Sequence, residues 1–473
     1  MHNSPIDVYI TVCCFMGDIF GEDNAFLAYL VLLIDRIRVI LYPEDTLQLL
    51  LFVPKLIFLL MKFSYSIISS LFAILMLLSC GEDRTYQYLE LTEEAQWIYS
   101  QMKENYLWSD SIKKPARKEF FSTASKFYAS LLYKEDNVSY FTDSASMTSY
   151  GMSFVLMRDP LEVERNRYYA LVLFVEPGSP ADDAGLKRGT WIYKADNNAL
   201  SVNKQNLLLS GNGITLSTRY IEQDDETMEY KWMDGDTLLL SAAEDLQQDA
   251  LFMDSLYNVR GRQIGYVICN SFDDDNLVTE IAAAFDKFRL SGVEDLIIDL
   301  RYNNGGSLAC AAKVASMLVP ADKAGSSFGH IEYNSNNADK KKEYYFEQVA
   351  STLETEKIYV LMTEQTSGTA EAFIAALRGA LGNEKVVLMG ATTAGKNLYV
   401  SSIESPYGYT INPAVAYLCS ANGTMLSSYG IFCDYAVDEL AQPTAIYQLG
   451  ELQEYMLYCT TYLISNGSLP ITN

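Results

Sequence analysis

The stretch Leu296–Gly306, with the sequence LIIDLRYNNGG, decides the fold of the larger part of this chain. Its first half is a short apolar run typical of a buried strand, and its last two residues are the glycines of a turn. Similar apolar runs occur at Ile264–Asn270, Ile358–Met362 and Val386–Met389. Helical patterns lie between them, at Val278–Phe288, Leu308–Leu318 and Ala370–Leu381. This alternation predicts an α/β domain with a largely parallel central sheet over residues 250–473.

The Gly-Gly turn at Gly305 and Gly306 is a first candidate for chemistry. Backbone N–H groups in such a turn can point at a developing oxyanion, although a plain strand-to-helix loop has the same appearance. Asp299, in the strand before it, is predicted to be structural and to pair with Arg301.

The segment Thr366–Phe373, TSGTAEAF, is a second candidate because it lies at the predicted start of a helix. A hydroxyl group there benefits from the positive end of the helix dipole. The alternative is that Ser367 is only the N-cap of that helix.

The segment Gly390–Asn397, GATTAGKN, follows a predicted strand and nearly matches a phosphate-binding P-loop. Asn397 stands where Ser or Thr would bind Mg²⁺, and Leu398–Ile403 has the pattern of a strand. A P-loop must open a helix, so we expect no nucleotide.

Residues 149–245 are predicted to be β-rich, with a strand at Tyr168–Val175. The run that follows, EPGSPADDAGLKRGTWI over 176–192, resembles the PDZ domains of bacterial proteases, with Thr190 in place of the usual Asp. PDZ domains take up a peptide as an added strand and bind its carboxylate with backbone amides. The resemblance puts that loop at Gly151, Met152, Ser153 and Phe154, unless this β-domain binds nothing.

The first eighty residues have the pattern of a targeting segment rather than of a folded domain. Residues 61–80 begin with Met-Lys, continue with a short apolar run and end in Leu-Leu-Ser-Cys, which resembles a lipoprotein signal peptide with Cys80 as the lipidated residue. A membrane anchor is the alternative. Residues 1–60 are interpreted as an over-extended start of translation, or else as a membrane hairpin. Residues 81–145 are predicted to be a tether, over 81–92, followed by a helical domain from 93 that ends near residue 136.

Composition excludes several classes of function. The chain has 473 residues, with 35 Lys and Arg against 60 Asp and Glu, and its formal net charge is -25. That charge argues against nucleic acid as a partner. The only histidines are His2 and His330, so a His-rich zinc site cannot be built, and we expect no metal and no cofactor. His330 lies in a polar stretch and is predicted to be exposed. Buried free thiols are predicted at Cys269, Cys310, Cys419, Cys433 and Cys459.

In this order, and behind a PDZ-like domain, the three segments resemble those of the C-terminal processing (tail-specific) serine peptidases over residues 93–440. Gly430–Asp434 and Tyr266–Phe272 resemble two further segments of that family, with Cys433 in place of a proline. The resemblance implies a multidomain α/β protein with a crotonase/ClpP-like catalytic domain. It also implies a Ser/Lys dyad in which Lys396 is the general base.

The nucleophile does not match the family pattern, in which a serine stands three residues before the glutamate. Counting back from Glu371 gives Gly368, whereas Ser367 is one position early and Thr369 one position late. One residue at a helix start turns a side chain by about 100°. Val400 also replaces a family glutamine.

Two hypotheses therefore stand. The first is a lipid-anchored serine endopeptidase in which Ser367, or less readily Thr369, attacks the peptide carbonyl and Lys396 accepts the proton. Gly305, Gly306 and Gly368 would then bind the oxyanion, and the PDZ-like domain would select substrates with accessible C-termini. The second is a pseudopeptidase that binds peptides without cleaving them. In both, the expected location is the envelope of a Gram-negative bacterium, at the outer membrane through Cys80.

Overall fold

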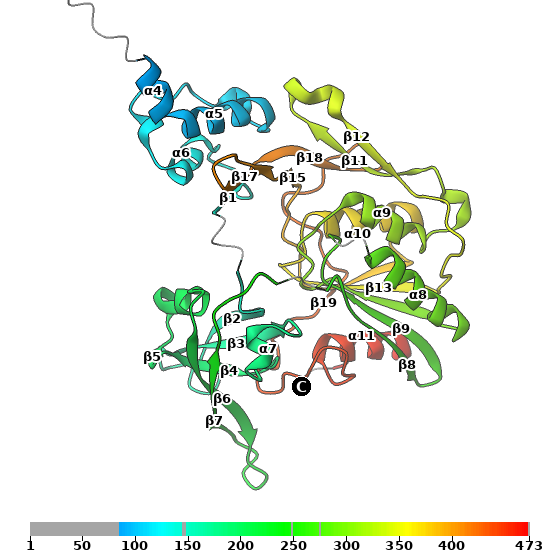
Figure 1. Cartoon of the computed structure of the whole chain (residues 1–473). Coiled ribbons are helices and arrows are strands. Elements are labelled where there is room, and N and C mark those ends of the chain that lie inside the picture. Colours follow the sequence, from blue (N-terminus) through cyan, green and yellow to red (C-terminus); the bar gives the residue numbers. More distant parts are fainter. Residues whose placement is uncertain (1–84, 144–147, 247–248, 274–275, 472–473) are drawn as a thin grey trace, which may run out of the picture. The chain divides into compact units, whose positions relative to one another are not determined.

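The computed structural model describes residues 85–143, 148–246, 249–273 and 276–471 (Figure 1). The predicted signal peptide with Cys80 and the segment 1–60 lie outside the described residues. The chain divides into two compact units, Met1–Leu89 and Glu90–Asn473. Helix α4 (Thr85–Leu91) forms where a tether was predicted. Among the described helices, none combines the length and the apolar character that a membrane span requires.

The segment that follows α4 is helical, as predicted. It contains α5 (Glu93–Asn105), α6 (Ala124–Leu131) and the short 3-10 turns η1 (Ser109–Ser111) and η2 (Glu119–Phe121). The buried residues of α5 recur at helical spacing, at Ala95, Ile98 and Met102. They pack with Ile411 and Ala414 of the later chain, so this helical part shares a core with the peptidase-like region.

Residues 149–245 form a twisted antiparallel sheet with the strand order β2-β3-β4-β6-β7, and β5 pairs with β4. The predicted strand at Tyr168–Val175 is confirmed as β3. The remaining elements are β2 (Met152–Arg158), α7 (Pro180–Asp183), β4 (Trp191–Ala195), β5 (Asn198–Ala199), η3 (Val202–Leu209), β6 (Ile214–Gln223) and β7 (Tyr230–Leu240). In the described chain β2 pairs only with β3, so it is an edge strand.

The predicted central sheet is confirmed. Its order is β19-β14-β13-β10-β9-β8, and only the β8–β9 pair is antiparallel. The strands are β8 (Leu251–Val259), β9 (Arg262–Cys269), β10 (Asp295–Asp299), β13 (Lys357–Met362), β14 (Val386–Gly390) and β19 (Tyr435–Ala436).

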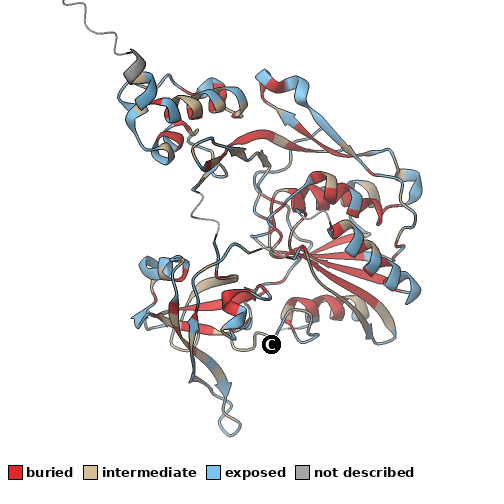
Figure 2. Cartoon of the chain, in the orientation of Figure 1, coloured by how far each residue is buried: buried red, intermediate tan, exposed pale blue. Residues whose placement is uncertain are grey.

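Both faces of this sheet are covered, which explains the continuous apolar runs in the sequence. Side chains alternate along each strand: Val267 and Cys269 of β9 join one core, and Tyr266 and Ile268 join the other. The first core packs against α8 (Leu277–Leu290), α9 (Leu308–Ser316) and α10 (Thr369–Leu381), and the second against α11 (Tyr455–Asn466) (Figures 1 and 2). The loops at the edge of the sheet are therefore connected to strands that are buried on both faces.

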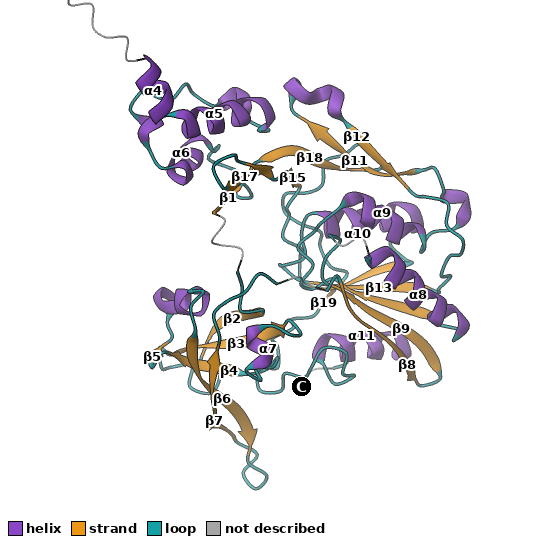
Figure 3. Cartoon of the chain, viewed as in Figure 1, coloured by secondary structure: helices purple, strands orange, loops and turns teal. Residues whose placement is uncertain are grey.

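Two smaller sheets complete the unit (Figure 3). One has the order β12-β11-β18-β15 and the other β1-β17-β16. Their strands are β1 (Tyr140–Asp143), β11 (Ser327–Tyr333), β12 (Lys342–Tyr345), β15 (Leu398–Val400), β16 (Ile403–Glu404), β17 (Tyr409–Asn412) and β18 (Ala414–Ser420), and the 3-10 segments are η4 (Ala321–Lys323) and η5 (Ser335–Lys340).

The prediction that His330 is exposed is wrong, because only 7% of its surface is accessible. The polar residues around it in sequence suggested a loop, but His330 lies on β11, between β12 and β18. The thiol prediction is confirmed for Cys269, Cys310, Cys419 and Cys459, which are buried and form no disulfide, whereas Cys433 is half-buried.

Candidate active site

The predicted nucleophile segment forms a strand–turn–helix unit, in which β13 leads through residues 363–368 into α10. The turn is tied to the loop after β10. The Thr366 hydroxyl donates to the Leu300 carbonyl at 2.8 Å, and the Ser367 amide donates to the Asn303 carbonyl at 3.0 Å. The two loops that sequence analysis singled out, NNGG and TSGT, therefore form one structure.

Gly368 occupies the N-cap of α10 with φ 61° and ψ -116°. This conformation is costly for a residue with a side chain, and strained strand-to-helix turns of this kind hold the nucleophile in some hydrolases. A Cβ atom on Gly368 would lie 3.8 Å from the Asn304 carbonyl oxygen and 4.0 Å from Gly305 Cα, which are ordinary contact distances. Position 368 therefore faces the Gly-Gly turn and has room for a small side chain.

Both hydroxyls beside Gly368 are hydrogen-bonded to main-chain carbonyls. The Ser367 residue is 0% exposed, and its hydroxyl donates to the Asn304 carbonyl at 3.2 Å. The Thr369 residue is 4% exposed, and its hydroxyl donates to the Gly306 carbonyl at 2.6 Å. Both hydroxyls thus serve the contact between the two loops.

Glu371 is a residue whose role the sequence analysis missed. Its carboxylate is buried and accepts four hydrogen bonds: from the Thr393 hydroxyl at 2.5 Å, and from the amides of Gly395 at 2.8 Å, Lys396 at 2.9 Å and Gly368 at 2.9 Å. We call this set the Glu371 clamp. It fastens the loop that carries Lys396 to the first turn of α10.

Lys396 is therefore brought to the nucleophile turn through its backbone. Its side chain is exposed, and among the described residues its ammonium group has neither Ser367 nor Thr369 as a hydrogen-bond partner. The segment after it forms β15, as predicted, rather than the helix that a P-loop requires. Ser367 and Lys396 lie in adjoining loops without forming a hydrogen-bonded dyad.

Of the predicted oxyanion donors, two amides are already engaged. Gly305 donates to the Asn303 side chain at 3.0 Å, and Gly368 donates to Glu371. Gly306 must be glycine, because a Cβ there would lie 2.5 Å from the Phe272 carbonyl carbon. An oxyanion role for these three residues stays a prediction.

A buried charge cluster lies beside the Gly-Gly turn. The prediction that Asp299 pairs with Arg301 is confirmed by an ion pair of 2.7 Å. The same guanidinium contacts Glu454 at 2.8 Å and Glu439 at 3.2 Å. Burial alone would raise the pKa of Glu439, but the charges of Arg301 and Arg188 outweigh it and lower that pKa.

Arg188 connects this cluster to the β-rich domain, which sequence analysis did not foresee. It follows α7, in the run that resembles a PDZ domain, and its guanidinium donates to Glu439 at 2.6 Å and to the Tyr302 hydroxyl at 2.8 Å. Tyr302 directly follows Arg301 and lies three residues before Gly305. A side chain of the β-rich domain is thus in direct contact with the loop that carries the predicted oxyanion donors.

The predicted peptide-binding loop lies at the start of the edge strand β2. Gly151 has φ +75° and packs on Ser179, and its amide donates to the Ser149 hydroxyl at 3.0 Å. Met152 and Ser153 pair with β3, and a bulge separates Ser153 from Phe154.

Comparison with known proteins identifies the family. The sequence pattern of peptidase family S41 matches residues 263–437, and that of the peptidase S41 N-terminal domain matches residues 93–140. The carboxy-terminal processing protease CtpA of Bacillus subtilis is 26% identical over 266 residues, which are 55% of this chain and 52% of that protein. The carboxyl-terminal-processing protease of Picosynechococcus is 25% identical over 253 residues, 52% of this chain and 55% of that one. The chain spans about half the length of these curated relatives.

A solved structure agrees with this result. A candidate S41 protease from Bacteroides fragilis superimposes with a TM-score of 0.68 and 26% identity, over 79% of this chain and 97% of the other. The family to which the sequence was likened is therefore confirmed. Residues 93–140 therefore match the N-terminal domain, and residues 263–437 the peptidase domain, of peptidase family S41, to which carboxy-terminal processing proteases are similar.

Proposed function

We propose that this chain binds the C-terminal tails of proteins and has kept the scaffold of an S41 peptidase without its nucleophile. The observation that carries the proposal is Gly368. It occupies the strained N-cap position three residues before Glu371, faces Gly305, and bears no hydroxyl. The hydroxyls of Ser367 and Thr369 donate hydrogen bonds to main-chain carbonyls.

Peptide binding is supported by the edge strand β2. In an edge strand, every second residue directs its N–H and C=O groups away from its single partner, so an extended peptide can pair with it. The strand follows the PDZ-like loop at Gly151, and its residues from Met152 to Met157 are half-exposed. Arg188 joins this β-rich domain to the loop after β10, so a bound tail would lie in a domain that contacts the peptidase site.

The decisive experiment restores the hydroxyl. Purified parent protein, Gly368→Ser, Gly368→Ala and the double variant Gly368→Ser/Lys396→Ala are incubated with an unfolded model protein. We expect the parent and Gly368→Ala to be inert and Gly368→Ser to gain cleavage of about 10²-fold or more over the blank. The double variant should lose that gain, because the exposed amine of Lys396 would be the only base in the adjoining loop. Cleavage by the parent at the rate of Gly368→Ser would overturn the proposal.

Tail binding is tested separately with fluorescent peptides that end in a free carboxylate or in an amide. Binding of the free acid by the parent, at least about tenfold tighter than that of the amide, is expected if a carboxylate loop exists. Equal affinity for both peptides would exclude recognition of C-termini.

A second candidate is the serine endopeptidase in which Ser367 and Lys396 form the dyad. It is favoured by one observation: the Ala394 amide donates to the Thr366 carbonyl at 2.9 Å, which holds the lysine loop directly beside Ser367. In that case the parent cleaves, and Ser367→Ala and Lys396→Ala each abolish cleavage while Gly368→Ala does not.

We further propose that Cys80 carries a lipid and that the protein resides in the cell envelope. The support is the Leu-Leu-Ser-Cys segment at residues 77–80. Mass spectrometry of the N-terminal peptide from membranes of the native host should find a diacylglyceryl Cys80. A natural product that retains residues 1–60 would contradict this.

A further inference from the structure

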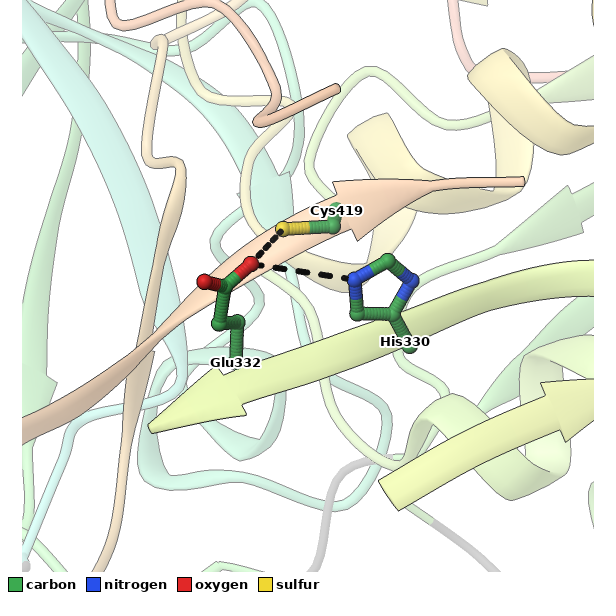
Figure 4. Close-up of side chains that lie close together, drawn as sticks. All are labelled: His330, Glu332 and Cys419. Carbon is green, nitrogen blue, oxygen red and sulfur yellow. Dashed lines mark hydrogen bonds and ion pairs between the residues drawn. The ribbon is translucent and has the colours of Figure 1, made fainter. Parts of the chain in front are cut away.

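Three side chains with metal-binding atoms meet on the sheet formed by β12, β11, β18 and β15. His330 on β11 lies directly opposite Cys419 on β18, and Glu332 follows two residues after His330, on the same face of β11. Figure 4 shows the imidazole, the thiol and the carboxylate directed toward one another. Their ligand atoms all lie within 4.8 Å of one another, with 3.8 Å from the Cys419 sulfur to the Glu332 carboxylate and 3.9 Å from His330 Nε2 to the same carboxylate.

We propose that His330, Cys419 and Glu332 form a binding site for one Zn²⁺ ion, with a fourth position open to solvent. An imidazole nitrogen, a thiolate and a carboxylate form a donor set that suits zinc, with bonds of about 2.0 to 2.3 Å. Tetrahedral geometry with such bonds places the ligand atoms about 3.3 to 3.7 Å apart. The two separations from the Glu332 carboxylate need to shrink by up to about half an ångström, and the separation between His330 and Cys419, which is at most 4.8 Å, by up to about 1.2 Å.

Two of the three residues are fixed by burial, and the third is free to move. His330 and Cys419 are 7% and 3% exposed and are held in register by the sheet. The Glu332 side chain is 61% exposed, so its carboxylate can rotate onto the ion without repacking the core. His330 and Cys419 are thus already in place, and Glu332 can adjust to the ion.

The other charged groups near the three ligands pair with each other. Glu343 on β12 lies opposite His330 and pairs with Lys341, which precedes β12, at 2.9 Å. Zinc binds a cysteine as its thiolate, so binding releases a proton and should tighten as pH rises.

The site lies outside the candidate active site, and the proposal does not rest on the proposed function. It would cross-link β11 to β18 and so stabilise the folded chain when the ion is bound. The Leu418 amide, next to Cys419, donates to the Asn397 carbonyl at 2.9 Å, so the clipped strand also supports the loop that carries Lys396.

The test is a calorimetric titration of the chelator-treated full chain with Zn²⁺, repeated with Co²⁺, whose absorption reports thiolate ligation. The variants are Cys419→Ser, His330→Asn and Glu332→Gln. Cys459→Ser is the matched control, because Cys459 is a buried free thiol on α11, outside the three-residue cluster. We expect one ion per chain, at least tenfold weaker binding in each of the three variants, and a melting temperature that rises with Zn²⁺ in the parent and in the control.

Glu332→Gln alters an exposed side chain and is expected to fold even if the buried variants do not. Unchanged affinity in Glu332→Gln and Cys419→Ser, or a Co²⁺ complex without a thiolate band, would mean an adventitious ion and overturn the proposal. So would the absence of binding to the parent.

Discussion

Two neighbouring parts of the first turn of α10, the Glu371 clamp and Gly368, differ in the side chains that they supply. The Glu371 clamp is complete: one buried carboxylate accepts four donors and fixes the lysine loop. Three residues earlier, Gly368 keeps the backbone conformation of a strained turn but carries no reacting group. The residue that positions the lysine loop is therefore not the residue at which a nucleophile is expected. A chain can keep the positioning residue and still lack the nucleophile.

Breaking the clamp should have the largest effect. Glu371→Ala leaves the hydroxyl of Thr393 and the amides of Gly368, Gly395 and Lys396 without their acceptor, and we expect a loss of about 3 kcal/mol or more in the free energy of unfolding. Chemical denaturation measures it. Glu384→Ala, at an exposed position after α10, should change the stability by less than about 0.5 kcal/mol. Equal losses in the two variants would mean that the clamp contributes nothing.

The turn itself is probed by two alanines in the same region. Gly368→Ala places a side chain at φ 61° and should cost about 1 to 2 kcal/mol. Gly379→Ala, within α10 and with nothing within 4 Å of its Cβ, should instead stabilise the chain by about 0.5 to 1 kcal/mol. A neutral result for Gly368→Ala would remove the argument that the turn is strained.

Ser367→Ala should cost about 1 kcal/mol, because it removes one hydroxyl bond to the Asn304 carbonyl. In the revived variant Gly368→Ser, the same change should leave cleavage within about threefold, since Ser367 serves the loop contact only. A loss of all cleavage in Gly368→Ser/Ser367→Ala would instead identify Ser367 as part of the reacting group.

The smallest effect is expected with pH. Glu371 is held by uncharged donors, whereas Glu439 is held by Arg188 and Arg301, which lower its pKa from 4.5. A lowered pKa stabilises the folded state above the unfolded value and loses that contribution as pH falls. Stability should therefore decline below about pH 4.5, and Arg188→Met should shrink that dependence. Urea midpoints between pH 3 and 7 measure it, and identical slopes in both proteins would contradict it.

Local patterns predicted the elements but not the contacts between them. The strand at Tyr168–Val175 and the parallel sheet follow from apolar runs, because each such run must be buried. Counting from Glu371 located Gly368, but its positive φ and its orientation toward Gly305 depend on a loop more than sixty residues away. Arg188 was missed for the same reason, since its partner Glu439 lies 251 residues along the chain.

The cluster of His330, Glu332 and Cys419 shows most clearly what sequence patterns cannot predict. A search for ligands at short spacing cannot find a histidine and a cysteine that only strand pairing brings together. The polar residues around His330 also concealed that it lies on an interior strand.

The glycine at position 368 has a consequence for how the protein can evolve. Some glycine codons become serine codons through a change of a single base, and the fold already provides the turn, the clamped lysine loop and a neighbouring β-rich domain. If Gly368→Ser hydrolyses peptides and the glycine codon is one of these, a lineage that carries this gene is one point mutation away from a protease. Such a lineage would gain proteolysis without a change in any other residue.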